Sequence, residues 1–137
     1  MIHRAFKILH IEDHLLYANG FKDSVMPFLP LAEYVNIQDG YKAIEYIEEQ
    51  ITNGISIDLI ITDINHPGLM GDELVQRLRL FEKEKGTKPI PLIVLSNVVS
   101  NQLLHISNPA LMVDKFILKI SDTDKIVEAI EGILCLQ

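Results

Sequence analysis

The chain contains a single cysteine, Cys135, so it cannot form an internal disulfide, and this scarcity suits a reducing compartment. It also lacks an apolar run long enough to cross a bilayer, which argues against membrane association. Residues 1–7 are too few and too polar for a secretory signal, and we therefore expect a cytoplasmic protein. Cys135 itself is expected to be a small apolar residue of the last helix.

Positive charge is scarce as well, because the chain has 12 Lys and Arg residues and 19 Asp and Glu residues, which gives a formal net charge of −7. Direct binding to nucleic acid needs a basic face, so we expect none from these residues. Hydrophobic residues make up 48% of the 137 residues and are spread evenly. Length and composition together predict one domain, residues 1–137, with its own core.

Apolar patterns predict strands and helices in alternation along the whole chain. Strands are expected at 6–11, 31–37, 59–61, 92–95 and 116–118, and helices at 14–28, 39–51, 72–85 and from 121 onward. A short, irregular helix is expected between 97 and 113, because Asn108-Pro109 interrupts its pattern. Five such units predict an α/β fold, a doubly wound parallel sheet with right-handed crossovers and helices on both faces.

Spacing and capping residues give finer expectations for three helices. Asp39 is expected to cap the second helix, and Ser121 with Asp124 matches a capping box for the last one. In the first helix, four apolar residues recur at helical spacing and should face the core: Ala18, Phe21, Val25 and Phe28.

Chemically active residues follow four of the five predicted strands: Glu12-Asp13, Asp63, Ser96 and Lys119. The carboxyl ends of parallel strands meet at one edge of the sheet, so we expect these side chains to lie together. Carboxylates within about 5 Å repel one another unless one is protonated or a cation lies among them. Hard oxygen ligands favour Mg²⁺, with Asp13 and Asp63 as direct ligands and Glu12 acting through water.

A carboxylate in such a site can do chemistry on phosphorus. With a metal screening its charge, Asp63 can act as a nucleophile and form an aspartyl phosphate. Lys119 offers a compact positive charge, and Ser96 offers a hydroxyl, to the phosphoryl oxygens. The alternative for each carboxylate is a structural role as a turn or helix cap.

This combination resembles the receiver domain of two-component response regulators, the CheY-like phosphoacceptor module. Four features carry the resemblance: Glu12-Asp13, the loop Asp63-x-x-x-Pro67-Gly68-x-x-Gly71, Ser96 after a buried strand, and Phe116-x-x-Lys119. It covers nearly the whole chain. Two features are most similar to those of receivers of LuxR-type regulators. They are the stretch 11–14 and the absence of a proline after Lys119.

The resemblance implies strand order 2-1-3-4-5 and a phosphoacceptor rather than an enzyme. Asp63 would take phosphate from a histidine kinase or phosphotransfer protein, and Asn65 would offer its backbone carbonyl to the metal. Ser96 and Phe116 would rearrange on phosphorylation. This would switch a face formed by the fourth helix, the fifth strand and the last helix, where an unknown output partner or a second copy would bind.

Three positions depart from the family pattern. His66 stands where Met is frequent, Asn97 where a smaller residue is usual, and Ile120 where Pro often follows the lysine. These departures leave open a degenerate receiver that only binds proteins. A phosphatase of the haloacid dehalogenase type is a further alternative, but such enzymes place a general acid two residues after the nucleophile, where this chain has Asn65.

Overall fold

Five strands form the sheet in the computed structural model, which describes residues 2–64, 68–97 and 108–135. They are β1 (Phe6–Ile11), β2 (Ala32–Ile37), β3 (Leu59–Thr62), β4 (Leu92–Ser96) and β5 (Lys115–Leu118). The helices are α1 (Leu15–Val25), α2 (Gly40–Thr52), α3 (Gly71–Lys85) and α5 (Thr123–Cys135), with short 3-10 helices η1 (Met26–Phe28) and η2 (Pro109–Leu111). No helix within these ranges has the length and apolar character that crossing a bilayer requires.

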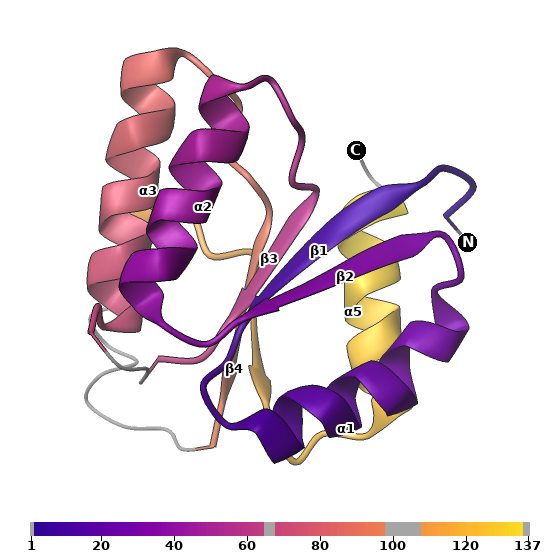
Figure 1. Ribbon diagram of the computed structural model, residues 1–137. Helices are drawn as coiled ribbons and strands as arrows, with labels where there is room; N and C mark the ends of the chain where they lie inside the picture. The colour runs from indigo at the N-terminus through magenta and orange to yellow at the C-terminus, as the bar shows by residue number, and fades with distance from the viewer. Residues whose placement is uncertain (1, 65–67, 98–107, 136–137) are drawn as a thin grey trace.

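All neighbouring strands are parallel, and their order is β2-β1-β3-β4-β5, which confirms the predicted fold and strand order (Figure 1). The strand β3 lies in the middle, and all four of its residues are buried. The chain order reverses between β1 and β3, and at such a switch point the carboxyl ends of the strands open a crevice. The fold therefore brings the ends of β1 and β3 together at a position suited to a ligand.

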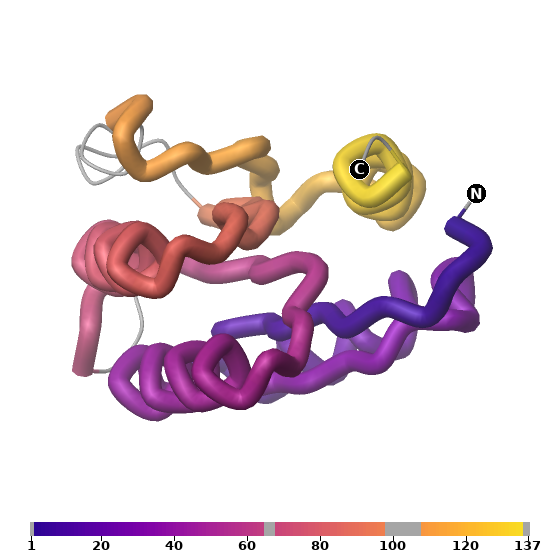
Figure 2. The backbone as a smooth tube through the Cα atoms, turned by 90° about the horizontal axis from the view of Figure 1, so that it is seen from above, coloured from indigo at the N-terminus to yellow at the C-terminus, as the bar shows by residue number. Residues whose placement is uncertain are grey.

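Helices cover both faces of the sheet, as the two views show (Figures 1 and 2). On one side, α2 and α3 pack over a core that includes Leu9, Ile60 and Leu78. On the other side, α1 and α5 pack over a second core, which includes Ile8 and Ile61. Adjacent residues of β1 and β3 thus enter opposite cores, and this explains why these strands read as unbroken apolar runs.

The ends of two helices have the expected chemistry. The carboxylate of Asp39 accepts hydrogen bonds from the backbone N–H groups of Tyr41 (2.7 Å) and Lys42 (3.1 Å), so its predicted cap is confirmed. Gly86 ends α3 with φ at 70°, a left-handed conformation that glycine adopts without steric strain.

Two details of the predicted helices are wrong. Phe28 is exposed rather than buried, because Pro27 lies in the 3-10 turn η1, whose three-residue period turns Phe28 outward and buries Leu29 instead. The helix α5 begins at Thr123, so Asp122 rather than Ser121 precedes it, and the carbonyl of Asp122 accepts from the backbone N–H groups of Lys125 and Ile126.

The predicted fourth helix falls largely outside the described residues, since 98–107 are not among them. The 3-10 helix η2 comes after this segment, and Asn108 caps it because its side-chain oxygen accepts from the backbone N–H of Ala110 at 3.0 Å. Asn108 has φ −54° and ψ 125°, outside the α region, as expected for a residue before proline.

A buried ion pair ties α3 to the chain that enters β5. Arg79 Nη1 donates to Glu82 Oε1 at 2.8 Å, and the same guanidinium donates to the backbone carbonyls of Leu111 (2.8 Å) and Met112 (3.1 Å). The other carboxylate oxygen of Glu82 accepts from the backbone N–H of Ile90 at 2.6 Å. Both side chains are almost fully buried, so each charge depends on its partner.

We predict that Arg79→Met lowers the free energy of unfolding by about 3 kcal/mol, because Glu82 is then a buried charge without its partner. Adding Glu82→Gln should recover part of this loss, since the unpaired charge disappears. Urea denaturation measures both. Arg77→Met is the matched control in the same helix, because the Arg77–Glu48 pair is more exposed and should contribute less than about 1 kcal/mol. Equal losses at positions 77 and 79 would contradict this account.

Candidate functional site

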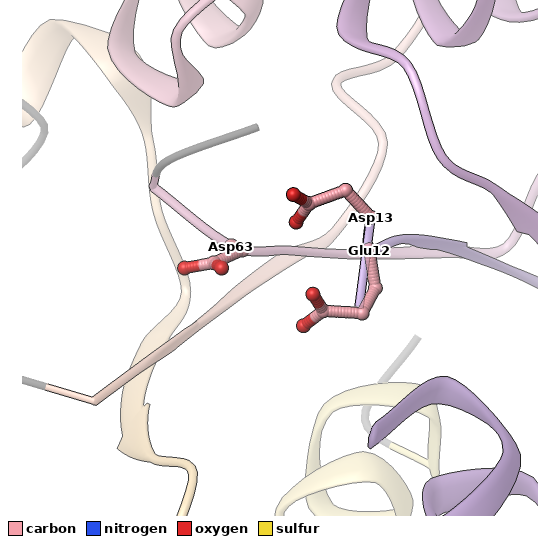
Figure 3. A group of neighbouring side chains, drawn as sticks. All are labelled: Glu12, Asp13 and Asp63. Carbon is pink, nitrogen blue, oxygen red and sulfur yellow. The ribbon is translucent and has the colours of Figure 1, made fainter. Parts of the chain in front are cut away.

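Three carboxylates meet at the carboxyl edge of the sheet, as predicted. Glu12 and Asp13 follow β1, and Asp63 follows β3. One ligand oxygen of each lies within 4.8 Å of those of the other two. Figure 3 shows Glu12 and Asp13 projecting to opposite sides of the chain, with Asp63 beside them on the neighbouring strand.

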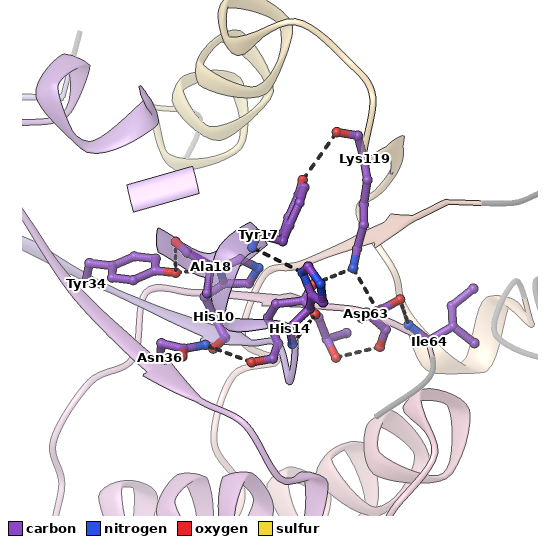
Figure 4. Close-up of polar contacts among 11 residues, drawn as sticks. His10, His14, Tyr17, Ala18, Tyr34, Asn36, Asp63, Ile64 and Lys119 are labelled. Atoms are coloured by element: carbon purple, nitrogen blue, oxygen red, sulfur yellow. Dashed lines mark hydrogen bonds and ion pairs between the residues drawn. The ribbon is translucent and has the colours of Figure 1, made fainter. Parts of the chain in front are cut away.

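Lys119 follows β5 and reaches across to two of these carboxylates. Figure 4 shows its side chain extending to Asp63. Its ammonium is 3.0 Å from Asp63 Oδ2 and forms a short ion pair with Glu12 Oε1. Burial by itself would lower the pKa of Lys119, but the hydrogen bonds to Glu12 and Asp63 outweigh it and raise that pKa. Lys119 therefore carries its positive charge at neutral pH.

Glu12 is fully buried and is held by two donors. Besides Lys119, the backbone N–H of His14 donates to Glu12 Oε2 at 3.0 Å. Burial raises the pKa of Glu12, against the opposing effect of the hydrogen bond from Lys119. From the β2 side, Asn36 Nδ2 donates to the backbone carbonyls of His10 (2.9 Å) and Glu12 (3.2 Å). The end of β1 is thus fixed through both its side chain and its backbone.

Asp63 is partly exposed, which leaves it accessible from solvent. Its Oδ1 accepts from the backbone N–H of Ile64 at 2.7 Å, and its Oδ2 accepts from Lys119. The backbone N–H of Asp63 itself donates to the carbonyl of Ile11 at 3.3 Å. Asp63 therefore presents a carboxylate that is oriented but not enclosed.

The remaining predicted site residues have different outcomes. Ser96 ends β4 as expected, and its carbonyl accepts from the backbone N–H of Lys119 at 2.9 Å. Phe116 pairs with Val94 of β4 and is 42% exposed. Asn65 and His66 lie outside the described residues, so the expected carbonyl ligand and the loop histidine stay predictions.

Two glycines shape the chain that comes after Asp63. Gly71 begins α3, and a Cβ atom there would lie 2.9 Å from the carbonyl oxygens of Asp63 and Ile64. The N–H of Gly71 also donates to the carbonyl of Ile64 at 2.7 Å. Gly68 has φ at 82°, and a Cβ there would approach the ring of Tyr41 to 2.6 Å. A side chain at Gly71 would displace the backbone that carries Asp63, whereas one at Gly68 would collide with the Tyr41 ring.

Sequence reasoning missed His10, which lies under α1 two residues before Glu12. It is fully buried beside Phe21, and its Nδ1 is 2.6 Å from the hydroxyl of Tyr34, which in turn donates to the carbonyl of Ala18 at 3.3 Å. Burial, with a smaller contribution from the charge of Lys119, lowers the pKa of His10 to about 3. His10 lies two residues after Ile8 and four after Phe6, so it faces the same side of β1 as these core residues. This spacing could have indicated a buried histidine.

The donor set suits a hard divalent cation. All three carboxylates offer oxygen, and oxygen ligands at this density favour Mg²⁺ or a similar ion. Formally, three carboxylates and one ammonium leave a net charge of −2 at the site (−3 and +1), which a divalent ion would balance. Glu12 is fully buried, whereas Asp13 is exposed and Asp63 is partly exposed, so Asp13 and Asp63 are better placed to be direct ligands.

Comparisons with known proteins find response regulators similar to this chain. The chain is 29% identical to the nitrate/nitrite response regulator NarP of Escherichia coli over 93% of this chain and 54% of that protein. It is 29% identical to the response regulator ARR17 of Arabidopsis thaliana over 65% of this chain and 62% of that protein. The solved structure of a phosphorylated cyanobacterial phytochrome response regulator, RcpA, superimposes with a TM-score of 0.76 at 25% identity, over 96% of this chain and 94% of that one.

Over nearly its whole length the chain is therefore similar to response-regulator receiver domains. The receiver domain of NarL from Mycobacterium tuberculosis has the same fold, with a TM-score of 0.74 at 19% identity over 98% of this chain. NarP and NarL are LuxR-type regulators, so the predicted similarity to that group is confirmed. No family model matches the sequence. The chain spans less than two thirds of the curated relatives it matches.

We predict that Gly71→Ala displaces the Asp63 backbone and lowers the free energy of unfolding by about 1–3 kcal/mol, as overpacking against a rigid neighbour does. Urea denaturation measures it. Gly20→Ala in α1 is the control, because a Cβ there meets nothing within 4 Å and alanine favours a helix by up to about 1 kcal/mol. A Gly71→Ala protein as stable as the wild type would contradict the close contact.

We predict a stability loss on acidification that depends on His10. Its pKa is about 3 in the folded chain and 6.5 when unfolded, so between pH 7 and pH 5 only the unfolded chain takes up this proton. The free energy of unfolding should therefore fall by about 2 kcal/mol from this group alone. Urea denaturation at both pH values should show a smaller fall for His10→Phe. An identical fall in both proteins would show that His10 is not the titrating group.

Proposed function

We propose that this receiver accepts a phosphoryl group on Asp63 from a phosphohistidine of a histidine kinase or phosphotransfer protein. The observation that carries the proposal is the Asp63 carboxylate, accessible at the sheet edge and set between two further carboxylates and the ammonium of Lys119. Few structural roles need three carboxylates and a buried lysine at the ends of three strands. A phosphoacceptor needs each of them.

The transfer is a displacement at phosphorus. A carboxylate oxygen of Asp63 forms the new O–P bond, the bond between phosphorus and the donor imidazole nitrogen breaks, and that nitrogen leaves with the electron pair. Lys119 places positive charge next to the entering phosphoryl oxygens, and the hydroxyl of Ser96 can donate to them. Ile64 N–H holds Asp63 Oδ1 in place, which orients the carboxylate before the donor arrives.

We propose Mg²⁺ as the metal, held directly by Asp13 and Asp63 and through water by Glu12. When bound, the ion would neutralise charge shared by the carboxylate and the phosphoryl oxygens. Asp13 is exposed and Glu12 is buried against Lys119, which supports this division of roles. Loss of Asp13 should therefore weaken Mg²⁺ binding more than loss of Glu12.

A protein donor fits the surroundings of the site. Leu16 and Ile120 are 80% and 85% exposed, an unusual exposure for large aliphatic side chains. They adjoin Tyr17 and Lys119, whose contact joins the start of α1 to the end of β5. An apolar rim beside a charged centre is the arrangement that a protein partner, rather than a small metabolite, would bury.

The output face is proposed to include β5 and α5. The strand β5 is at the edge of the sheet, and Phe116 and Leu118 are each 42% exposed on it. A movement of Ser96 toward a phosphoryl group would act on β5 directly, because Ser96 pairs with Leu118. An output partner or a second copy of the chain would bind there.

We predict that acetyl phosphate with Mg²⁺ adds one acid-stable, base-labile phosphoryl group, and that Asp63→Asn or removal of the metal by EDTA abolishes it. Intact-mass spectrometry measures the addition. Asp23→Asn is the control, because Asp23 is an exposed carboxylate of α1 away from the sheet edge. Labelling that survives Asp63→Asn would overturn the assignment. A wild type that is never labelled would favour the degenerate receiver instead.

A further inference from the structure

Tyr17 contacts both ends of Lys119, and the proposed chemistry gives it no role. The Lys119 ammonium lies 4.6 Å from the centre of the Tyr17 ring, within the range of a cation–π interaction. The Tyr17 hydroxyl also donates to the backbone carbonyl of Lys119 through a long hydrogen bond of 3.5 Å. Figure 4 shows the ring lying beside the lysine side chain between these two contacts.

The local fold gives Tyr17 this position. Tyr17 is in the first turn of α1, where its backbone N–H donates to Nδ1 of the capping residue His14 at 3.3 Å. Its ring also packs edge-on against His10, with ring centres 6.2 Å apart. Tyr17 is therefore anchored by the helix cap on one side and by a buried ring on the other. Burial raises its pKa, so the phenol stays neutral across the physiological range.

The other partners of Lys119 change their chemistry during the proposed reaction. Phosphorylation converts the Asp63 carboxylate to an acyl phosphate, a mixed anhydride, and places negative charge on the phosphoryl oxygens. Glu12 would share its charge with the metal. The ring of Tyr17 neither accepts phosphate nor binds Mg²⁺, so its attraction for the ammonium remains unchanged throughout.

We infer that Tyr17 is a positioning residue for Lys119. The ring of Tyr17 holds the Lys119 ammonium, and the hydroxyl of Tyr17 holds the backbone of Lys119. This inference rests on the proposed phosphoryl transfer to Asp63. An aromatic face attracts a cation over a broad area, so Lys119 can shift toward incoming phosphoryl oxygens without losing the contact. The hydroxyl meanwhile restrains the backbone from which the side chain extends.

The test compares rates of phosphorylation by acetyl phosphate at fixed Mg²⁺. Tyr17→Leu removes the ring and should slow phosphorylation about fivefold, the scale of a partly desolvated cation–π contact. Tyr17→Phe keeps the ring and should recover most of the rate. In a Lys119→Ala background, Tyr17→Leu should have no further effect, because its target is gone. Tyr46→Leu is the matched control, since Tyr46, on α2, contacts Lys7 away from the site.

A second measurement does not depend on phosphorylation. The Lys119 Hε protons should show an upfield ring-current shift in NMR spectra of the wild type and of Tyr17→Phe, and this shift should vanish in Tyr17→Leu. No such shift in the wild type, or a rate of Tyr17→Leu equal to that of the wild type, overturns the inference. A full effect of Tyr17→Leu in the Lys119→Ala background does so too. If the wild type takes up no phosphate, the proposed function fails while the NMR result still decides the contact.

Discussion

The ion pair of Lys119 with Glu12 and Asp63 is the interaction on which the site depends. Two carboxylates at the ends of adjacent strands repel each other, and the ammonium offsets that repulsion. To do so, Lys119 must cross the end of β4, because β4 lies between β3 and β5. A long, flexible side chain is needed, and the small Ser96 at the end of β4 is compatible with its path.

The cluster of Glu12, Asp13, Asp63 and Lys119 would respond both to a bound cation and to a phosphoryl group on Asp63. The formal charge of −2 would be balanced by the proposed divalent ion, and a phosphoryl group on Asp63 would remove one carboxylate charge while adding nearly two of its own. Lys119 is common to both events because it touches Asp63 directly. Whatever changes the charge at Asp63 must therefore change the forces on the loop after β5.

The sequence predicted the strands and the clustered strand ends well, because both result from local apolar runs and from the geometry of parallel sheets. It did not predict that Phe28 turns outward, since Pro27 changes the helical period from 3.6 to 3 residues per turn. Tyr17 and His10 were missed for another reason. The alternation on β1 could indicate that His10 is buried, but the partners of these residues, Lys119 and Tyr34, are distant in sequence, and spacing along the chain carries no information about them.

The two flanks of the site differ in how firmly they are held. Asn36 fixes the end of β1 by bonding two carbonyls on the same edge, and Gly71 leaves no free space behind the Asp63 backbone. On the other flank, β5 is an edge strand whose residues are mostly exposed, so it is bounded by a neighbour on one side alone. When the charge at Asp63 changes, the backbone of β1 and α3 is therefore held in place, whereas the backbone of β5 is less restrained and can move. Structural change should therefore travel through Lys119 to the β5 edge, since displacement there disrupts the fewest buried contacts.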